Sequence, residues 1–184
     1  EIQSGVGRTG SWYAFQKAEV MPDIIVLAKG LASGMPLGAC VSTEEIMSKW
    51  SPGAHGGTYS GNPISCAAAV ASLKVIEENL PKIDALSRFA FDYLRTHLAG
   101  HPNIGDIRGI GLMIGIELVR DNESRESYPE LIKLVLNKAL EKGLVLISAG
   151  VEDNVIRLAP PLVIDQPILE EGLSILCEVL NAVN

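Results

Sequence analysis

The 184-residue sequence has few cysteines, few aromatic residues and no long apolar run. Cys40, Cys66 and Cys177 are too few and too far apart for a disulfide framework or a zinc site, so no metal centre is expected. They are expected to be small buried side chains in a reducing, cytoplasmic compartment. No stretch approaches the roughly 18 apolar residues of a membrane span, and no signal segment is expected at the start.

Positive charge is also scarce. Fifteen lysines and arginines stand against 22 aspartates and glutamates, which gives a formal net charge of −7. A balance this acidic argues against a nucleic-acid or anionic-membrane surface. The 47% of hydrophobic residues excludes wholesale disorder and is enough for a substantial core.

The first third of the chain combines glycine-rich loops with short apolar runs. Residues 24–28 form a continuous apolar stretch, which predicts a strand buried on both faces, as in a parallel sheet covered by helices. A second short strand is expected over 37–42, and the glycine-rich residues 51–61 are expected to form a loop. Asn62 followed by Pro63 predicts a helix start, because a capping side chain precedes a proline at the first helical position.

Two helices are expected after that start. The first runs to about Asn79, and Pro81 is expected to interrupt it. The second is predicted by apolar residues three and four positions apart, which are Ile83, Leu86, Ala90, Leu94 and Leu98. The break predicts a domain boundary at 79–81, with one domain over 1–79 and a second over 80–184.

Beyond Gly100 the pattern predicts the order strand, helix, strand, strand, helix. Residues 112–118 alternate large apolar side chains with others, which indicates a strand with one buried face. A helix is expected over 131–142, short strands over 144–148 and 154–159, and a final helix that Asp165 can cap. Its apolar face is expected to consist of Leu169, Leu173, Leu176 and Leu180. The pattern predicts the α/β class, or α+β for the second half.

Lys29 is the most informative candidate for a reactive side chain. It follows the apolar run 24–28, and ligands of α/β sheets bind beyond the carboxyl ends of the strands. Desolvation there would disfavour the ammonium form and make the amine available to attack a carbonyl. The alternative, which position alone favours, is a lysine that extends from the strand end to water. Residues 5–10 match G-x-G-x-x-G, but without a full preceding strand they indicate a plain turn.

Thr58 and Arg157 are candidate anion-binding residues. Thr58 lies in a glycine-rich loop before a helix start, where backbone amides attract phosphate, although a surface turn explains that loop better when it is taken alone. Arg157 lies between apolar neighbours in an expected strand, so an inward-facing guanidinium needs a partner such as a substrate carboxylate. An outward-facing arginine on an edge strand fits the alternation about equally well. Arg108 is expected to form a structural ion pair with a nearby acid, and Glu117 is expected to be structural too.

Five segments, taken together and in order, resemble the class III, pyridoxal-phosphate-dependent aminotransferases, and most closely their 4-aminobutyrate and ornithine branch. Residues 1–10, 22–31 and 56–63 are similar to that family's glycine-rich signature, cofactor-lysine strand and phosphate loop. Residues 108–113 and 155–162 are similar to its C-terminal-domain motifs. The resemblance covers essentially the whole chain. It implies the C-terminal part of a fold-type I transferase: the end of the large α/β domain over 1–79 and the α+β small domain over 80–184.

The resemblance also implies a role for each site residue. Lys29 is expected to bind pyridoxal 5′-phosphate through its amine and then to move the proton between the substrate and cofactor carbons. Ile2 is expected to pack against the pyridine ring, and Gln3 to hydrogen-bond the ring hydroxyl. Thr58 is expected to hold the cofactor phosphate of the neighbouring subunit in a homodimer. Arg157 is expected to bind the carboxylate of the amino acid or oxo acid.

The activity implied is the transfer of an amino group to an oxo acid such as 2-oxoglutarate, with a 4-aminobutyrate-like ω-amino donor favoured. The family's aspartate that pairs with the pyridine nitrogen, and the segments that complete its cofactor site, are missing from this sequence. The 184 residues alone are therefore expected to be inactive or nearly so. Two alternatives stay open: another reaction on the same cofactor, such as that of an aminomutase or racemase, and a non-catalytic α/β binding or assembly module.

Overall fold

The computed structural model describes residues 1–183. The contacts group the chain into two compact units, Glu1–Pro81 and Lys82–Asn184. Each unit has its own set of buried apolar side chains. That 1–79 and 80–184 are the two domains stays a prediction. Within the described residues, no helix combines the length and the apolar character needed to cross a membrane.

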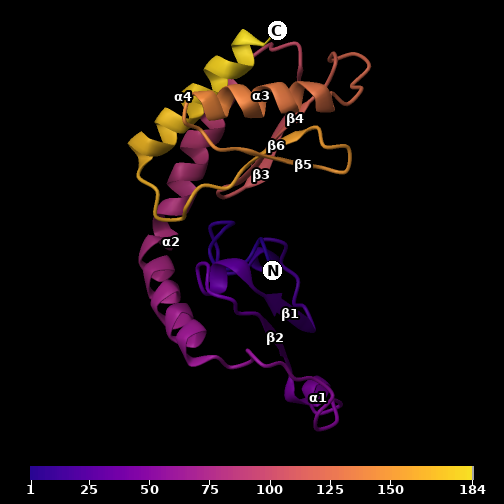
Figure 1. The fold of residues 1–184 in the computed structure, drawn as a ribbon, viewed down its shortest axis with the longest axis vertical. Helices are drawn as coiled ribbons and strands as arrows, with labels where there is room; N and C mark the ends of the chain where they lie inside the picture. The colour runs from indigo at the N-terminus through magenta and orange to yellow at the C-terminus, as the bar shows by residue number, and fades with distance from the viewer. Residues whose placement is uncertain (184) are drawn as a thin grey trace. The chain divides into compact units, whose positions relative to one another are not determined.

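The first unit contains a two-stranded antiparallel sheet of β1 (Ile24–Leu27) and β2 (Ala39–Ser42) (Figure 1). Short helices flank it: η1 (Ala14–Gln16), η2 (Lys29–Leu31) and α1 (Glu44–Met47). The expectation of a parallel strand buried on both faces is wrong for the described chain. Ile24 is 51% exposed, because β1 pairs with one antiparallel neighbour and this ribbon has too few elements to cover both faces.

The long helix α2 (Pro63–His97) begins where the sequence predicted. The side-chain oxygen of Asn62 accepts hydrogen bonds from the backbone N–H of Ile64 (2.9 Å) and of Ser65 (3.1 Å). The predicted interruption at Pro81 is wrong, because the helix continues through this proline. Pro81 removes one backbone hydrogen bond, and the helix has a buried side chain on either side of it, Ile76 and Ile83.

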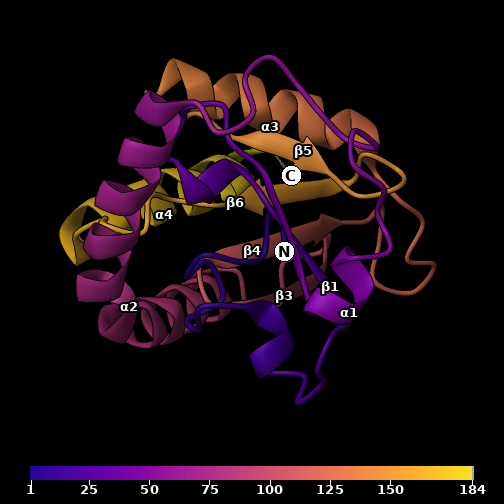
Figure 2. The same cartoon turned by 90° about the horizontal axis from the view of Figure 1, so that it is seen from below.

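The second unit is built on a four-stranded antiparallel sheet in the order β3-β4-β6-β5 (Figure 2). The strands are β3 (Ile104–Ile110), β4 (Met113–Leu118), β5 (Ile147–Ala149) and β6 (Val155–Leu158). Between them and after them come α3 (Pro129–Glu141) and α4 (Gln166–Ala182). The predicted order lacked β3, and β5 overlaps the predicted strand over 144–148 but begins only at Ile147.

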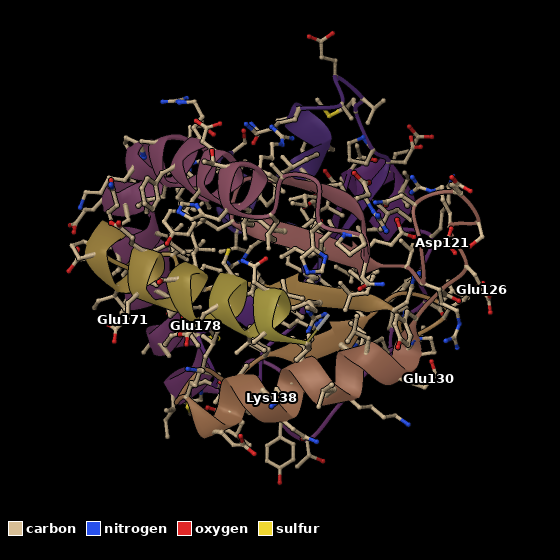
Figure 3. The ribbon with its side chains drawn as sticks, turned by 90° about the horizontal axis from the view of Figure 1, so that it is seen from above. Asp121, Glu126, Glu130, Lys138, Glu171 and Glu178 are labelled. Carbon is tan, nitrogen blue, oxygen red and sulfur yellow. The ribbon has the colours of Figure 1, made fainter. Side chains whose placement is uncertain are left out.

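The core of the second unit lies between this sheet and its helices. The predicted alternation of β4 is confirmed, since Ile114, Ile116 and Leu118 are buried and the residues between them are half-buried. The predicted apolar faces of α2 and α4 are buried as well. Figure 3 shows α3 and α4 side by side over the sheet, with Lys138 and Glu178 among their polar side chains.

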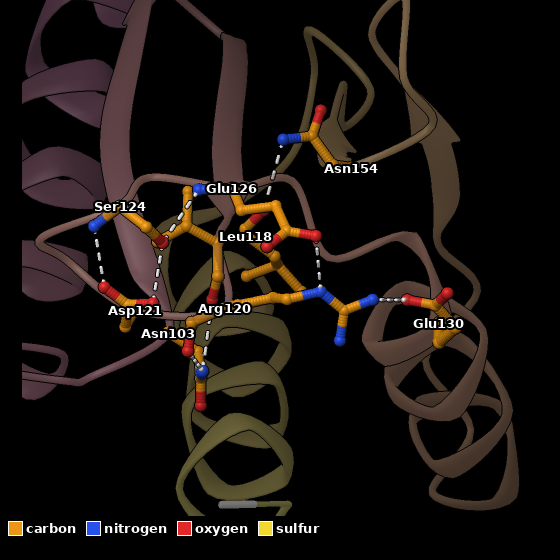
Figure 4. Close-up of polar contacts among 9 residues, drawn as sticks. Asn103, Leu118, Arg120, Asp121, Ser124, Glu126, Glu130 and Asn154 are labelled. Carbon is orange, nitrogen blue, oxygen red and sulfur yellow. Dashed lines mark hydrogen bonds and ion pairs between the residues drawn. The ribbon is translucent and has the colours of Figure 1, made fainter.

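Polar contacts hold the connection between β4 and α3 in place (Figure 4). Arg120 forms ion pairs with Glu126 (3.2 Å) and with Glu130 of α3 (3.0 Å). The amide group of Asn103 donates to the backbone carbonyls of Val119 and Arg120. The two hydrogen bonds of Asn103 satisfy backbone carbonyls that lie outside the sheet ladder.

The cysteines differ in burial. Cys177 is buried in α4, as predicted, but the expectation is wrong for Cys40 and Cys66, which are exposed. Cys40 lies in the ribbon of the first unit, and Cys66 lies on the uncovered side of the first turn of α2. Within the described residues, no group of three or more histidine, cysteine or acidic side chains is placed to hold a metal ion.

Candidate functional site

Lys29 is the first residue of η2, and only Ala28 separates it from the end of β1. Its backbone is left-handed, with φ 48°. A residue other than glycine in this region costs about 1 kcal/mol or more, and it persists only where its surroundings fix the chain. Leu31 and Ala32 provide that constraint, because both are buried and the Leu31 N–H donates to the carbonyl of Ala28 (3.1 Å).

Lys29 lines an open hollow of about 500 Å³, together with Gly30 and residues 33–37. Lys29 is exposed, so the desolvation expected from the sequence is not present in the described chain. The hollow has no acidic side chain in its lining. It therefore offers a reachable primary amine without a carboxylate to neutralise it.

The glycine-rich turn over 1–10 adjoins the segment of Lys29. A Cβ added at Gly30 would lie 3.8 Å from the Cβ of Val6, which is buried. Ile2 and Gln3 precede this contact, and both side chains are exposed. Within residues 1–183 the Gln3 amide has no hydrogen-bond partner. The structure thus brings the two segments together while leaving the Gln3 amide free.

The carboxylate of Glu1 accepts hydrogen bonds from groups within the N-terminal turn and from η1. It accepts hydrogen bonds from the hydroxyl of Ser4 (2.9 Å) and from the backbone N–H of Ala14 (3.1 Å) and Phe15 (3.0 Å). Burial alone would raise the pKa of this carboxyl, but the hydrogen bonds outweigh it and hold the pKa below its usual range. Glu1 is therefore a structural anchor of the turn.

Two buried hydroxyls in the first unit have no hydrogen-bond partner. They are Oγ1 of Thr9, which is 1% exposed, and Oγ of Ser65 in the first turn of α2. Orphaned buried groups are uncommon and call for a physical reason. Near Thr9, burial lowers the pKa of the Arg8 guanidinium. Neither hydroxyl could be singled out from the sequence, because nothing local marks a serine or threonine as unpaired.

Thr58 lies in the exposed loop 51–61 and lines a second hollow, of about 560 Å³. This hollow and that of Lys29 share a wall at Pro36 and Leu37. Trp50 and His55 lie on the rim of the second hollow, with ring centroids 5.7 Å apart. Thr58 and Lys29 thus lie in adjacent hollows of the same unit.

Arg157 belongs to β6 of the second unit. It lies opposite Gly115 of β4 and Ile147 of β5. Its Nε is buried and has no hydrogen-bond partner among the described residues. The expectation of an edge strand is wrong, because β6 lies between β4 and β5.

Arg108 forms a structural ion pair with a nearby acid, as expected, and the structure identifies this acid as Glu117. The guanidinium of Arg108 donates to Glu117 (2.8 Å) and to Asp106 (3.2 Å), and these hydrogen bonds raise the pKa of Arg108. Arg125 adds a longer contact to Glu117 (3.6 Å). The network joins β3 to β4 on the side of the sheet that carries Arg157.

These residues fit pyridoxal phosphate as a ligand. Lys29 supplies a reachable amine for an aldehyde, its hollow is wide enough for a small aromatic ring, and Thr58 with its neighbouring glycines supplies donors for a phosphate.

Comparison with known proteins identifies the family of the chain. The model for "Aminotransferase class-III" matches residues 1–180. The chain belongs to the class III aminotransferase family. The predicted family, fold class and pyridoxal-phosphate dependence are confirmed.

Individual relatives show how far the similarity reaches. The chain is 41% identical over 183 residues to the 4-aminobutyrate aminotransferase GabT of Escherichia coli, covering 98% of this chain and 43% of that protein. It is 42% identical over 175 residues to a leucine/methionine racemase of Thermococcus litoralis, covering 94% and 39%. A solved aminotransferase structure from Bacillus anthracis superposes with a TM-score of 0.92 at 33% identity, over 99% of this chain and 44% of that one. This class III aminotransferase chain spans less than half the length of these relatives.

Proposed function

We propose that the chain carries the cofactor-lysine part of an enzyme that moves an amino group from an amino acid to an oxo acid such as 2-oxoglutarate. The observation that supports this most directly is Lys29. Its left-handed backbone follows β1, and its exposed side chain lines an open hollow beside the glycine-rich turn. Backbone strain of this kind is typical of functional sites.

The proposed roles on the cofactor side divide among four residues. Lys29 binds pyridoxal phosphate through its amine. Ile2 packs on the pyridine ring, and the free amide of Gln3 hydrogen-bonds the ring hydroxyl. Thr58 binds a phosphate, and we propose that it does so for the neighbouring subunit of a homodimer, which agrees with its place in a different hollow from Lys29.

Arg157 is proposed to bind the carboxylate of the amino acid or oxo acid. Its unpaired, partly buried guanidinium supports this role, because a carboxylate matches the guanidinium fork with two hydrogen bonds. The proposed donor is an ω-amino acid resembling 4-aminobutyrate. The relative named as a 4-aminobutyrate aminotransferase supports that choice.

When bound, the cofactor supplies an electron sink for the bond that breaks at the substrate carbon. The protein supplies binding and proton movement. Nζ of Lys29 would hold the cofactor and, when free, would accept and release the proton that moves during the reaction. Arg157 holds the carboxylate meanwhile. The chain spans less than half the length of its relatives, and we propose that this chain alone is inactive or nearly so.

Reductive labelling tests the proposal. The chain is incubated with pyridoxal phosphate and reduced with borohydride, and the cofactor mass is located by peptide mapping. We expect it on the peptide that contains Lys29, and we expect Lys29→Arg to abolish it. Lys49→Arg, at an exposed lysine of the same unit, serves as the matched control and should keep the label. Label spread evenly over surface lysines, or unchanged by Lys29→Arg, would refute the assignment.

A racemase-type reaction is the second candidate, and the similarity to a leucine/methionine racemase favours it over other chemistry. The same cofactor residues serve both reactions. The two differ in that only amino transfer requires an oxo acid. Mixing the chain with a separately produced N-terminal half of a relative and assaying with and without 2-oxoglutarate separates them. A non-catalytic module would show no turnover in either assay.

A further inference from the structure

The four strands of the second unit's sheet contain two acidic residues and two arginines. Asp106 and Arg108 lie in β3, Glu117 lies in β4 and Arg157 lies in β6. Residues that stand opposite each other in neighbouring strands place their side chains on the same face of a sheet. The register pairs Arg108 with Gly115 of β4, and Gly115 with Arg157. All four charged side chains therefore lie on one face, opposite to the buried face of β4.

The ion pairs on this face all go to one of its two arginines. The guanidinium of Arg108 donates to Asp106 (3.2 Å) and to Glu117 (2.8 Å). The side chain of Arg157 forms no ion pair or hydrogen bond within residues 1–183, although its Nε is enclosed. Because a desolvated donor without an acceptor is costly, this unequal division of two acids between two arginines needs a physical reason.

A pair between Glu117 and Arg157 is within reach. Glu117 stands directly opposite Val155, so Arg157 is its diagonal neighbour across the pair of β4 and β6. Diagonal neighbours lie about 7 to 8 Å apart, a distance that long side chains span. The other two residues of this group, Gly115 and Val155, have shorter side chains. Distance alone therefore does not explain why the pair is missing.

Two arginines hold the carboxylate of Glu117 from the side of β3. Strand β4 lies between β3 and β6 (Figure 2). Arg108 of β3 contacts Oε2 of Glu117 at 2.8 Å, and Arg125, from the loop after β4, contacts the same oxygen at 3.6 Å. Nη2 of Arg125 also lies close to β3, because a Cβ added at Gly105 would be 3.6 Å from it. Both cations thus draw Glu117 away from β6.

We propose that Arg108 and Arg125 are positioning residues, which hold Glu117 toward β3 and so keep the guanidinium of Arg157 free of an internal partner. Without these two cations, the attraction of opposite charges would bring Glu117 and Arg157 together. A guanidinium that is kept unpaired stays available to an anion from outside the chain. That this anion is the substrate carboxylate rests on the proposed function, whereas the positioning of Glu117 does not.

The reactivity of Arg157 toward phenylglyoxal, which modifies free guanidinium groups, tests the proposal in the full chain. The rate is followed by mass on the peptide released by cleavage after Lys142, which contains no other arginine. Arg108→Gln combined with Arg125→Gln should slow the modification by about threefold, the size expected of a partly exposed ion pair. Adding Glu117→Gln should restore the wild-type rate. A loosened sheet would speed the modification, so the direction of the change separates positioning from a merely structural role.

Three further variants serve as controls. Arg108→Lys keeps a cation beside Glu117 and should react like the wild type. Glu117→Gln alone should leave the rate unchanged, because Glu117 is not the partner of Arg157 in the wild type. Arg88→Gln combined with Arg95→Gln removes two exposed arginines of α2 that form no ion pair within the described residues, and it should also change nothing. A rate that is unchanged or faster without Arg108 and Arg125, or that Glu117→Gln does not restore, would overturn the proposal.

A double-mutant cycle tests the same pairing without a reagent. In the wild type, the shifts of the urea midpoint caused by Glu117→Gln and Arg157→Gln should add up in the double variant, because the two side chains do not interact. Where Arg108 and Arg125 are both replaced by glutamine, the shifts should no longer add up, since the two side chains then form a pair. Additive shifts in both backgrounds would refute the proposal. Labelling at Lys29 involves none of these residues, so either proposal can fail while the other stands.

Discussion

Glu1 and Phe15 are joined by a hydrogen bond of 3.0 Å from the backbone N–H of Phe15 to the carboxylate of Glu1. The same carboxylate accepts the N–H of Ala14, so one side chain ties the start of the glycine-rich turn to η1. Ile2 and Gln3 follow Glu1 directly. The position of these two proposed cofactor contacts therefore depends on an anchor that is itself not proposed to touch the cofactor.

This anchor should weaken in acid. The hydrogen bonds hold the pKa of Glu1 below its ordinary value of 4.5, despite the opposing effect of burial. Because the folded pKa is the lower one, the contribution to stability is complete above the unfolded pKa and is lost as the pH falls through the folded pKa. The amide NMR signals of Ala14 and Phe15 should shift together in that range. Glu1→Gln should abolish the transition, and Glu19→Gln, at an exposed residue nearby, should leave it unchanged.

Gly109 should tolerate no side chain. Its φ is 153°, and an added Cβ would overlap the carbonyl oxygen of Met113 on the paired strand. We expect Gly109→Ala to destabilise the second unit by roughly 3 kcal/mol or more in urea unfolding, because strain and overlap act together. Gly100→Ala is the control: φ is 71° and no atom lies within 4 Å of its added Cβ, so a loss of about 1 kcal/mol is expected. Similar losses in both variants would contradict this account of Gly109.

The parts of the fold that the sequence predicted well are those with local signals. The alternation over 112–118 and the spacing of the leucines in α4 depend only on which side of one element faces the core. The start of α2 depends on Asn62 and its next three residues. An ion pair of Arg108 with a nearby acid could be expected from the local charges, whereas Glu117 as its partner follows from the register of β3 and β4.

The errors and omissions have non-local causes. Strand β3 contains Gly105, Asp106 and Gly109, residue types that are uncommon in strands, so its sequence does not indicate a strand. It forms because β4 pairs with it. The direction of the β1 pairing, the left-handed backbone of Lys29 and the missing partner of Arg157 all depend on contacts with distant residues. Position in the chain singles out Lys29, Thr58 and Arg157, and the resemblance to a family adds Ile2, Gln3 and the individual roles. The burial and the partners of these residues could only come from the structure.

Cys177 should react far more slowly than the other cysteines. Burial raises the pKa of its thiol to about 11, so at pH 8 only about one molecule in a thousand carries the thiolate even before access is considered. Cys40 and Cys66 are exposed. Brief alkylation with iodoacetamide followed by peptide mass analysis should modify these two and spare Cys177, and in urea all three should react. Modification of Cys177 at the rate of Cys66 in the folded chain would show that α4 does not protect it.

Replacing Pro81 should stabilise the protein. Pro81 lies inside the continuous helix α2, where proline is about 3 kcal/mol less favourable than alanine and leaves the carbonyl of Glu77 without its helical donor. Pro81→Ala restores that N–H at an exposed position, so we expect a gain of about 1 to 3 kcal/mol in urea unfolding. Pro63→Ala is the control, because proline at the first helical position removes no helical hydrogen bond and should change stability by less than about 0.5 kcal/mol. A Pro81→Ala variant that is no more stable than the wild type would contradict this expectation. It would mean that α2 accommodates the proline without a loss of stability, so that a helix interrupted at Pro81 and a continuous helix differ little in free energy.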